Sequence, residues 1–493
     1  MPGDIALRST TLDNGMRVVV NPDMTCPAVA VNIWYRVGSA DETVGHFGFA
    51  HLFEHLMFSG TTSGIASGEH LAAVESVGGT ANATTSFDRT NFFETVPAGA
   101  LELALWLESE RLAHLAVTTE NLDIQREVVK EEKRQRYDNL PYGDMLAHLL
   151  AQQFGADGVA EGHPYAHPTI GSVPDLDAAC LDDVVSFHRQ WYRPDNACLV
   201  IAGCVDADRA LLLADRYLGA VPAGEGPAPY RDRTPSVPSL SVSSLSEPSL
   251  TVPALPLPSR RVLEREVPRT AVSLSWPSPP VTDADQLSLE DALSVLQTGM
   301  ASRLVRHLLR DLQLVEGISG YDLGLSRGRS TAALVASLRP GVEESRYIDE
   351  VSAALRRLAA EGPTAAEMAR VHAQVERDWL LELATADDRA DAINFYETIM
   401  GSGHRVNDYL DRMGRVGADD VARAAARWLD PDKASVLVYR RLESGPAGGV
   451  EAGVEDEAGI EDGAGVEDET GVAHEIGIDQ GADGDAELSK ESR

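Results

Sequence analysis

The 493-residue sequence is poor in basic residues: 42 lysines and arginines stand against 77 acidic residues, for a net charge of −35 at pH 7. Proteins that bind nucleic acid use clustered basic side chains to replace phosphate counterions, so this deficit argues against a nucleic-acid partner. The sequence also lacks any run of about eighteen apolar residues. We therefore expect no transmembrane helix and no membrane partner.

Cysteine is scarce as well. The four cysteines are Cys26, Cys180, Cys198 and Cys204. They form no Cys-x-x-Cys pair, which argues against a structural zinc knuckle. The first fifteen residues lack a basic segment followed by an apolar one, so they do not resemble a secretory signal. We expect a cytoplasmic protein with reduced thiols.

Two stretches have compositions that disfavour regular structure. Residues 223–262 are rich in proline and serine and are interpreted as a linker. Residues 442–493 repeat a glycine- and acid-rich theme, as in GVEDEAGIEDGAGVEDE, and we expect a disordered tail because they can bury little apolar area. The rest of the chain divides into an N-terminal half, residues 1–222, and a C-terminal half, residues 263–441.

The two halves resemble each other at two places. AVAVNIWYRVG, from Ala28, and TAVSLSWPSPP, from Thr270, each predict an alternating strand followed by a polar turn. WYRPDNACLVIAG, from Trp191, matches WLDPDKASVLVYR, from Trp428, and each predicts a helix end, a Pro-Asp turn and a buried strand. The spacing of about 240 residues indicates an internal duplication, with chance similarity of short strands as the alternative. Helices and strands mix without a strict βαβ order, so we predict an α+β fold for each half.

The stretch GHFGFAHLFEHLMFSGTT combines His51, Glu54 and His55. Its order, His-x-x-Glu-His, inverts the His-Glu-x-x-His pattern of zinc proteases. We predict a helix over residues 44–59, which places the two histidines one turn apart on one face, where they can bind one metal ion. Glu54 would project beside the ion, where a carboxylate can take a proton from water. Two buried histidines without a metal are the alternative.

A catalytic zinc site needs a third protein ligand. The segment TTENLDIQREVVKEEKRQRYDN predicts a helix over residues 119–137. Three glutamates on that helix, Glu127, Glu131 and Glu132, are candidates for the ligand.

Helical periodicity discriminates among these glutamates. The apolar residues that define the predicted inward stripe are Leu122, Ile124, Val128 and Val129. Glu132 falls near the centre of this stripe, and the other two glutamates fall toward its polar flank. A carboxylate on a buried face needs a partner or a metal, so we predict Glu132 as the third ligand. Gln125, on the same stripe, is predicted to support the site from behind the ligands.

These residues resemble the insulinase/pitrilysin family of zinc metallopeptidases, and in particular the bacterial relatives of the mitochondrial processing peptidase. The stretches that carry the resemblance are HLFEH at 51–55, ANATTSFDRTNFFETV at 81–96, REVVKEE at 126–132, HPYAHPTIGS at 163–172 and YRPDNACLVIAG at 192–203. It covers roughly residues 10–440, excluding the linker.

The resemblance implies two duplicated α/β halves that close as a clamshell around a central chamber. It implies one Zn²⁺ per chain, held by His51, His55 and Glu132, with Glu54 as the general base of an endopeptidase. The family pattern has an acidic residue seven positions before the ligand glutamate, where this sequence has Gln125.

The resemblance also implies how a substrate is bound. The strand near residues 81–96 is expected to lie at a sheet edge facing the metal, where an extended peptide adds by backbone hydrogen bonds. Asn82 and Ala83 are the predicted contacts. The expected substrates are short unfolded peptides or presequence-like segments.

The C-terminal half has no metal motif. In active relatives this half supplies an Arg and a Tyr, seven residues apart, that hold the substrate. Here Arg310 is retained, but the aromatic position falls near Glu316, and Tyr321 is too far along the chain. We therefore expect a homodimer, or a heterodimer with a paralogue that supplies this pair. The alternative function is a catalytically weak or inactive assembly subunit of a two-chain peptidase.

Overall fold

The structure is a computed structural model, which describes residues 4–155, 163–226 and 258–442. Most of the linker predicted at residues 223–262, and nearly all of the tail predicted at 442–493, lie outside the described residues. Within the described ranges, no helix combines the length and the apolar character needed to cross a membrane.

The N-terminal half is built on a six-stranded sheet with the order β1-β2-β6-β3-β5-β4. Its strands are β1 (Arg8–Thr11), β2 (Arg17–Pro22), β3 (Ala28–Tyr35), β4 (Thr80–Thr85), β5 (Thr90–Pro97) and β6 (Ala197–Gly203). Its helices are α1 (Phe49–Leu56), α2 (Glu69–Ser76), α3 (Leu101–His114), α4 (Thr119–Lys133), α5 (Met145–Phe154), α6 (Val173–Ala178), α7 (Leu181–Trp191) and α8 (Ala207–Leu218). A π-helical turn, η3 (Arg134–Asp138), continues α4.

The C-terminal half repeats this plan with a five-stranded sheet in the order β7-β11-β8-β10-β9. Its strands are β7 (Arg260–Arg265), β8 (Ala271–Ser278), β9 (Val315–Asp322), β10 (Ser330–Leu338) and β11 (Ser435–Arg441). Its helices are α9 (Gln286–Gln297), α10 (Glu344–Glu361), α11 (Ala365–Glu382), α12 (Ala386–Thr398), α13 (Tyr409–Met413) and α14 (Ala418–Trp428), with a π-helical turn, η6 (Val305–Asp311), after α9.

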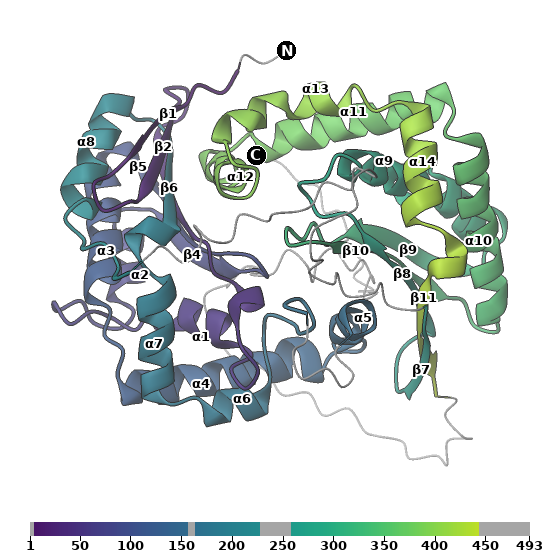
Figure 1. Ribbon diagram of the computed structural model, residues 1–493, viewed down its shortest axis with the longest axis horizontal. Helices are drawn as coiled ribbons and strands as arrows, with labels where there is room; N and C mark the ends of the chain where they lie inside the picture. The colour runs from purple at the N-terminus through teal and green to yellow at the C-terminus, as the bar shows by residue number, and fades with distance from the viewer. Residues whose placement is uncertain (1–3, 156–162, 227–257, 443–493) are drawn as a thin grey trace, which may run out of the picture.

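The topology confirms the duplication. β6 runs parallel to β2 and antiparallel to β3, and β11 runs parallel to β7 and antiparallel to β8. The segments matched in the sequence are therefore the central strands of each sheet. The tryptophans that mark the repeat, Trp191 and Trp428, each end the helix that precedes the last strand of a half. The molecule is an α+β protein of two duplicated halves (Figure 1).

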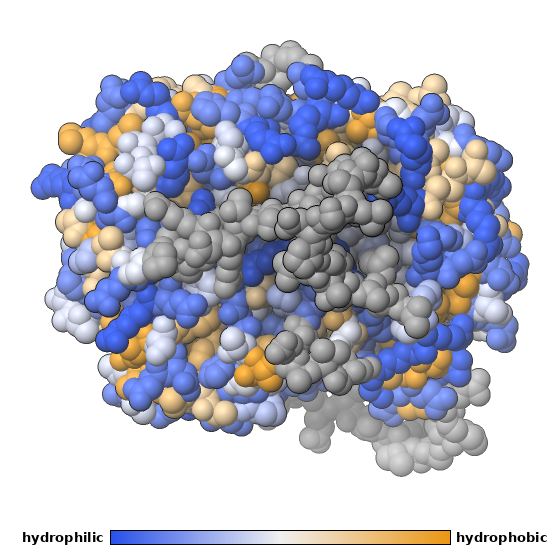
Figure 2. Space-filling view, viewed as in Figure 1, coloured by the Kyte–Doolittle hydropathy of each residue, from blue (hydrophilic) through white to orange (hydrophobic). Residues whose placement is uncertain are grey.

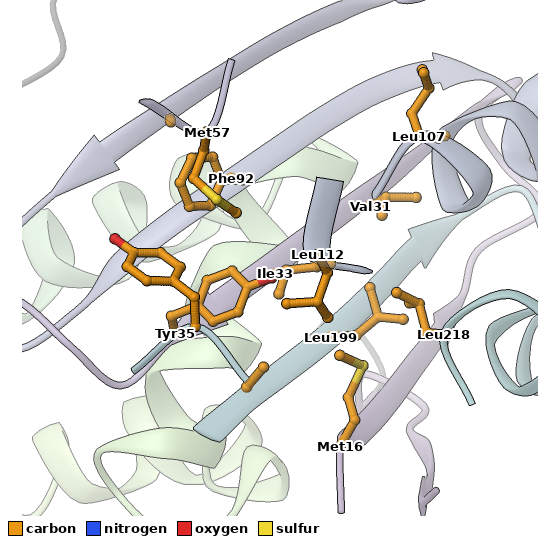
Figure 3. Packing of buried hydrophobic residues seen from close by; sticks show 14 of the residues in the cluster. Met16, Val31, Ile33, Tyr35, Met57, Phe92, Leu107, Leu112, Leu199 and Leu218 are labelled. Carbon is orange, nitrogen blue, oxygen red and sulfur yellow. The ribbon is translucent and has the colours of Figure 1, made fainter. Parts of the chain in front are cut away.

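Alternate residues of β3 pack in two different places. Val31 and Ile33 point to the core beneath the helices of their own half, where Leu107 and Leu112 of α3 meet them (Figure 3). The opposite face of this sheet, including Ala30, packs against α12 of the C-terminal half. Both faces are covered, which explains why β3 and β6 read as nearly continuous apolar runs.

Each half also contributes a helix that packs against the sheet of the other half. α5 of the N-terminal half packs against β8 and β11 of the C-terminal sheet, and Gln153 Nε2 donates to Ser275 Oγ at 2.8 Å. The halves thus face each other across a cavity of about 530 Å³, to which Trp34 and Asp88 contribute from one side and Glu290 from the other. This arrangement of two halves around a cavity is the predicted clamshell. Hydrophilic residues predominate on the face of the molecule in Figure 2, as the acidic composition leads one to expect.

Candidate metal centre

The helix that carries His51, Glu54 and His55 begins later than predicted. α1 starts at Phe49 rather than at residue 44, because Gly45 and Gly48 have left-handed backbones, with φ of +89° and +103°. A left-handed residue cannot continue a right-handed helix upstream. The predicted start of this helix was therefore wrong by five residues.

A buried carboxylate completes the start of α1. The two carboxylate oxygens of Glu42 accept hydrogen bonds from the backbone N–H groups of Gly48, at 2.8 Å, and Ala50, at 2.7 Å. These N–H groups have no partner within the helix, so a side chain must satisfy them. His167 lies 3.6 Å from the same carboxylate through Nδ1 and stacks on Phe47, so it has a structural role.

The stripe predicted on α4 was partly wrong. Leu122 and Val129 are buried, but Ile124 is 53% exposed and Val128 is 44% exposed. The buried residues lie seven positions apart, and three more positions lead to Glu132 on the same face. The prediction of Glu132 as the ligand is therefore supported by Leu122 and Val129 but not by the other two residues of the predicted stripe. Gln125 lies on the same face and is half-buried.

The neighbouring glutamates point elsewhere. Glu127 is exposed and pairs with Lys130 at 2.9 Å, and Glu131 is exposed and pairs with Arg134. Both belong to the solvated face of the helix.

The structure brings the three predicted ligands together. Glu132 Oε2 lies 3.5 Å from His51 Nε2 and 3.3 Å from His55 Nε2, and the three donor atoms all lie within 4.8 Å of one another. In a tetrahedral zinc site with bonds of about 2.1 Å, ligand atoms are about 3.4 Å apart. Two imidazole nitrogens and one carboxylate oxygen also form the donor set of catalytic zinc sites. These residues therefore fit a zinc ion.

The protonation states suit a metal as well. Burial, and then the neighbouring His55, lower the pKa of His51 to about 4, so its imidazole is neutral at pH 7. Burial alone would raise the pKa of Glu132, but the hydrogen bond to His55 and the interactions with the two histidines and Arg136 outweigh it and lower the pKa. Arg136, one turn further on, contributes through Nη1, 3.3 Å from Glu132 Oε1. A neutral imidazole and an ionised carboxylate are the forms that bind metal.

Glu54 is held by the end of a neighbouring strand. It is buried, and the hydroxyl of Thr85, the last residue of β4, donates a hydrogen bond to Glu54 Oε2. The predicted general base is thus tied to the strand predicted to bind substrate.

β4 is an edge strand, paired with β5 on one side and at the end of the strand order on the other. Asn82 lies opposite Phe93 and Ala83 lies opposite Phe92. The side-chain carbonyl of Asn82 accepts a hydrogen bond from the N–H of Ala83 at 2.9 Å, and the side chain of Ala83 is buried. Their binding of a substrate stays a prediction.

The residues considered for the Arg/Tyr pair are dispersed. Arg310 is exposed near the end of η6, and Glu316 pairs with Arg269 at 2.8 Å. Tyr321 is buried in the cluster in which Met145 of α5 meets the C-terminal sheet. This tyrosine serves the contact between the halves.

A second group of metal-type donors exists within the described residues. It consists of His70, Glu94 and Glu108, all buried. Glu94 contacts His70 Nε2, and Arg111 donates to both oxygens of Glu108. The guanidinium supplies the positive charge that an ion would otherwise bring, so this group is a buried ion-pair network.

Sequence reasoning missed several residues that shape the site. Arg136 could have been found, since it lies four positions after Glu132 on the same helix. Glu42 and Thr85 carry no comparable signal, because each reaches the site through contacts made only in the fold.

Comparisons with known proteins agree with this geometry. A family model described as insulinase (peptidase family M16) matches residues 17–162, and one described as the peptidase M16 inactive domain matches residues 179–375. The chain is 26% identical over 433 residues to the zinc protease PqqE of Helicobacter pylori, covering 87% of this chain and 92% of that protein. It is 27% identical over 449 residues to an uncharacterized zinc protease of Streptomyces coelicolor, covering 90% and 91%.

Solved structures show the same fold. A protease from Helicobacter pylori matches with a TM-score of 0.77 at 24% identity, over 89% of this chain and all of that one. Pitrilysin matches with a TM-score of 0.69 at 19% identity, over 89% of this chain and 45% of its own. With models for both halves, relatives of similar length and the His-x-x-Glu-His helix in place, the chain belongs to the insulinase/pitrilysin family, peptidase family M16.

Proposed function

We propose that the protein is a zinc endopeptidase that hydrolyses short unfolded peptides or presequence-like segments. One observation carries this proposal: the donor atoms of His51, His55 and Glu132 lie at the spacing of a tetrahedral zinc site, with Glu54 on the same helix. The model described as inactive matches residues 179–375, whereas all four of these residues lie within 17–162.

The chemistry divides between the ion and the chain. When bound, zinc would polarise the scissile carbonyl and lower the pKa of the attacking water. Glu54 takes the proton from that water and passes it to the leaving amine. Thr85 holds one carboxylate oxygen of Glu54, which restricts the rotation of the base and leaves its other oxygen for the proton. Gln125 supports the ligand face of α4.

Substrate binding is proposed at the edge of the N-terminal sheet. An extended peptide would add to β4 by backbone hydrogen bonds near Asn82 and Ala83, a mode that tolerates many sequences. The adjoining cavity of about 530 Å³, within the range typical of ligand pockets, has room for a few side chains.

A second chain is proposed to complete the substrate contacts. Arg310 lacks a tyrosine at the expected spacing, so a second copy or a paralogue would supply an Arg/Tyr pair from its own C-terminal half. Stimulation of cleavage by such a paralogue supports this pairing, and full activity of the purified chain alone contradicts it.

Metal analysis and peptide cleavage test the function together. We expect about one zinc per chain, loss of zinc in His51→Ala, and retention of zinc in Glu54→Gln. Cleavage of an unstructured peptide should fall about 10²- to 10⁴-fold in Glu54→Gln, the range for loss of a general base. Bound zinc with no cleavage that depends on Glu54, with or without a paralogue, would instead identify an assembly subunit.

A further inference from the structure

Among the polar contacts between the C-terminal half and the N-terminal sheet, one carboxylate joins two strands at once. Asp391, on α12, accepts three hydrogen bonds at a single oxygen, Oδ1. The donors are Trp34 Nε1 at 2.8 Å, Asn91 Nδ2 at 2.9 Å and Asn32 Nδ2 at 3.2 Å. Two of these donors lie on β3 and one on β5, so this oxygen joins both strands to the opposite half.

Further hydrogen bonds lead from Asn91 toward the metal centre. The side-chain carbonyl of Asn91 accepts hydrogen bonds from the backbone N–H of Thr84, at 3.1 Å, and from its hydroxyl, at 2.6 Å. The next residue, Thr85, donates to Glu54. A continuous path of hydrogen bonds and one peptide linkage therefore runs from Asp391 to the predicted general base.

The turn between β4 and β5 is held by the C-terminal half at a second point. Asp88 accepts hydrogen bonds from the backbone N–H and the hydroxyl of Ser326, at 3.0 and 2.8 Å. Arg327 Nε lies 2.9 Å from the same carboxylate, and its other nitrogens pair with Asp41. The hairpin is thus held at two points by residues far away in the sequence.

We propose that Asp391 is a positioning residue, through which the C-terminal half sets the β4–β5 hairpin and hence the placement of Glu54. The proposal rests on the peptidase function above. It gives the half that lacks metal ligands an influence on the reaction through the hairpin. Small errors in the placement of a catalytic group are costly, because a shift of about 1 Å can slow a reaction about 100-fold.

Three variants separate positioning from simple stability. Asp391→Leu removes the acceptor at similar size, whereas Asp391→Asn keeps a carbonyl oxygen that can accept the same bonds. Arg389→Met is the matched control. Arg389 lies on the same helix and also joins the two halves, through an ion pair of 2.7 Å with Asp23 and a hydrogen bond to Asn21 of β2, both away from the hairpin. If Asp391→Leu does not fold, Asp391→Ser replaces it, since its hydroxyl is too short to reach all three donors.

The first readout is steady-state kinetics of the zinc-loaded protein. We expect kcat to fall about 10- to 100-fold in Asp391→Leu with KM changed less than about threefold, and Asp391→Asn to stay within about threefold of wild type. Arg389→Met should keep the wild-type kcat. Equal losses in Asp391→Leu and Arg389→Met, or no rescue by asparagine, would reduce Asp391 to a structural contact and overturn the proposal.

The second readout does not need activity. Amide hydrogen exchange should become faster across residues 80–91 in Asp391→Leu and stay unchanged there in Arg389→Met. Unchanged exchange in Asp391→Leu overturns the proposal. If the wild type cleaves no peptide, the peptidase function fails, and exchange still reports whether Asp391 holds the hairpin.

Discussion

At the scale of single residues, the proposed chemistry depends on the hydroxyl of Thr85. It donates to Glu54 Oε2 at a buried site, where water cannot readily take over the bond. A hydrogen bond to a charged group contributes about 1.5–3 kcal/mol, which corresponds to roughly one to two powers of ten in rate if it is needed in the transition state.

We therefore expect Thr85→Val to lower kcat about 10- to 100-fold while zinc content stays at the wild-type level. Thr85→Ser keeps the donor and should remain close to wild type. Metal analysis and cleavage of an unstructured peptide measure both effects. A Thr85→Val protein with full activity would show that the base needs no such support.

At the level of the element, the start of α1 shows how a fold can override a local pattern. The apolar and histidine spacing predicts a helix from residue 44, but two left-handed glycines and the Glu42 carboxylate move the start to Phe49. Gly48 is also crowded, since a Cβ there would lie 3.1 Å from the backbone oxygen of Ile170.

Alanine substitution should separate backbone strain from crowding. Gly45 has the same type of backbone but nothing within 4 Å of an added Cβ, so Gly45→Ala should cost about 1 kcal/mol of unfolding free energy, the cost of a left-handed backbone for a residue with a Cβ. Gly48→Ala should cost about 2–3 kcal/mol and also reduce zinc content, because α1 begins at the next residue. Denaturant unfolding and metal analysis check this, and equal losses in both variants would contradict it.

At the level of the whole molecule, the two halves are joined by polar contacts as well as by α5 and α12. Asp144, just before α5, accepts a hydrogen bond from the hydroxyl of Tyr439 on β11 at 2.5 Å. Hydrogen bonding to His148 and to this hydroxyl outweighs burial and lowers the pKa of Asp144 to about 2. Asp144 therefore binds a proton more readily in the unfolded chain than in the folded one. Its contribution to the stability of the fold is present above about pH 4 and is lost as the pH falls toward 2.

Replacing Asp144 should make stability less sensitive to acid. We expect the wild type to exceed Asp144→Asn in melting temperature at about pH 6 and the gap to narrow at about pH 3. Tyr439→Phe, which removes only the hydroxyl, should also melt below the wild type at about pH 6, with a smaller gap at about pH 3. Thermal unfolding at the two pH values is the measurement, and a gap that widens in acid would contradict the assignment.

The sequence by itself determined the donor set, the third glutamate and the duplication. His51 and His55 are one helical turn apart, Glu132 follows the helical period of Leu122 and Val129, and the paired tryptophan segments mark equivalent strands. Periods and spacings of this kind are local, so they can be read without a structure. The helical period also predicted that Ile124 and Val128 are buried, and this was wrong, because the exposure of a helical residue depends on which neighbouring elements cover it.

Only the tertiary structure decided what holds these groups in place. Glu42 reaches the start of α1, Thr85 reaches Glu54 across 31 positions, and Asp391 reaches Asn91 across 300. None of these contacts produces a pattern along the chain, because it arises when separate elements pack. The metal ligands were therefore predictable, whereas the support of the base by the opposite half was not.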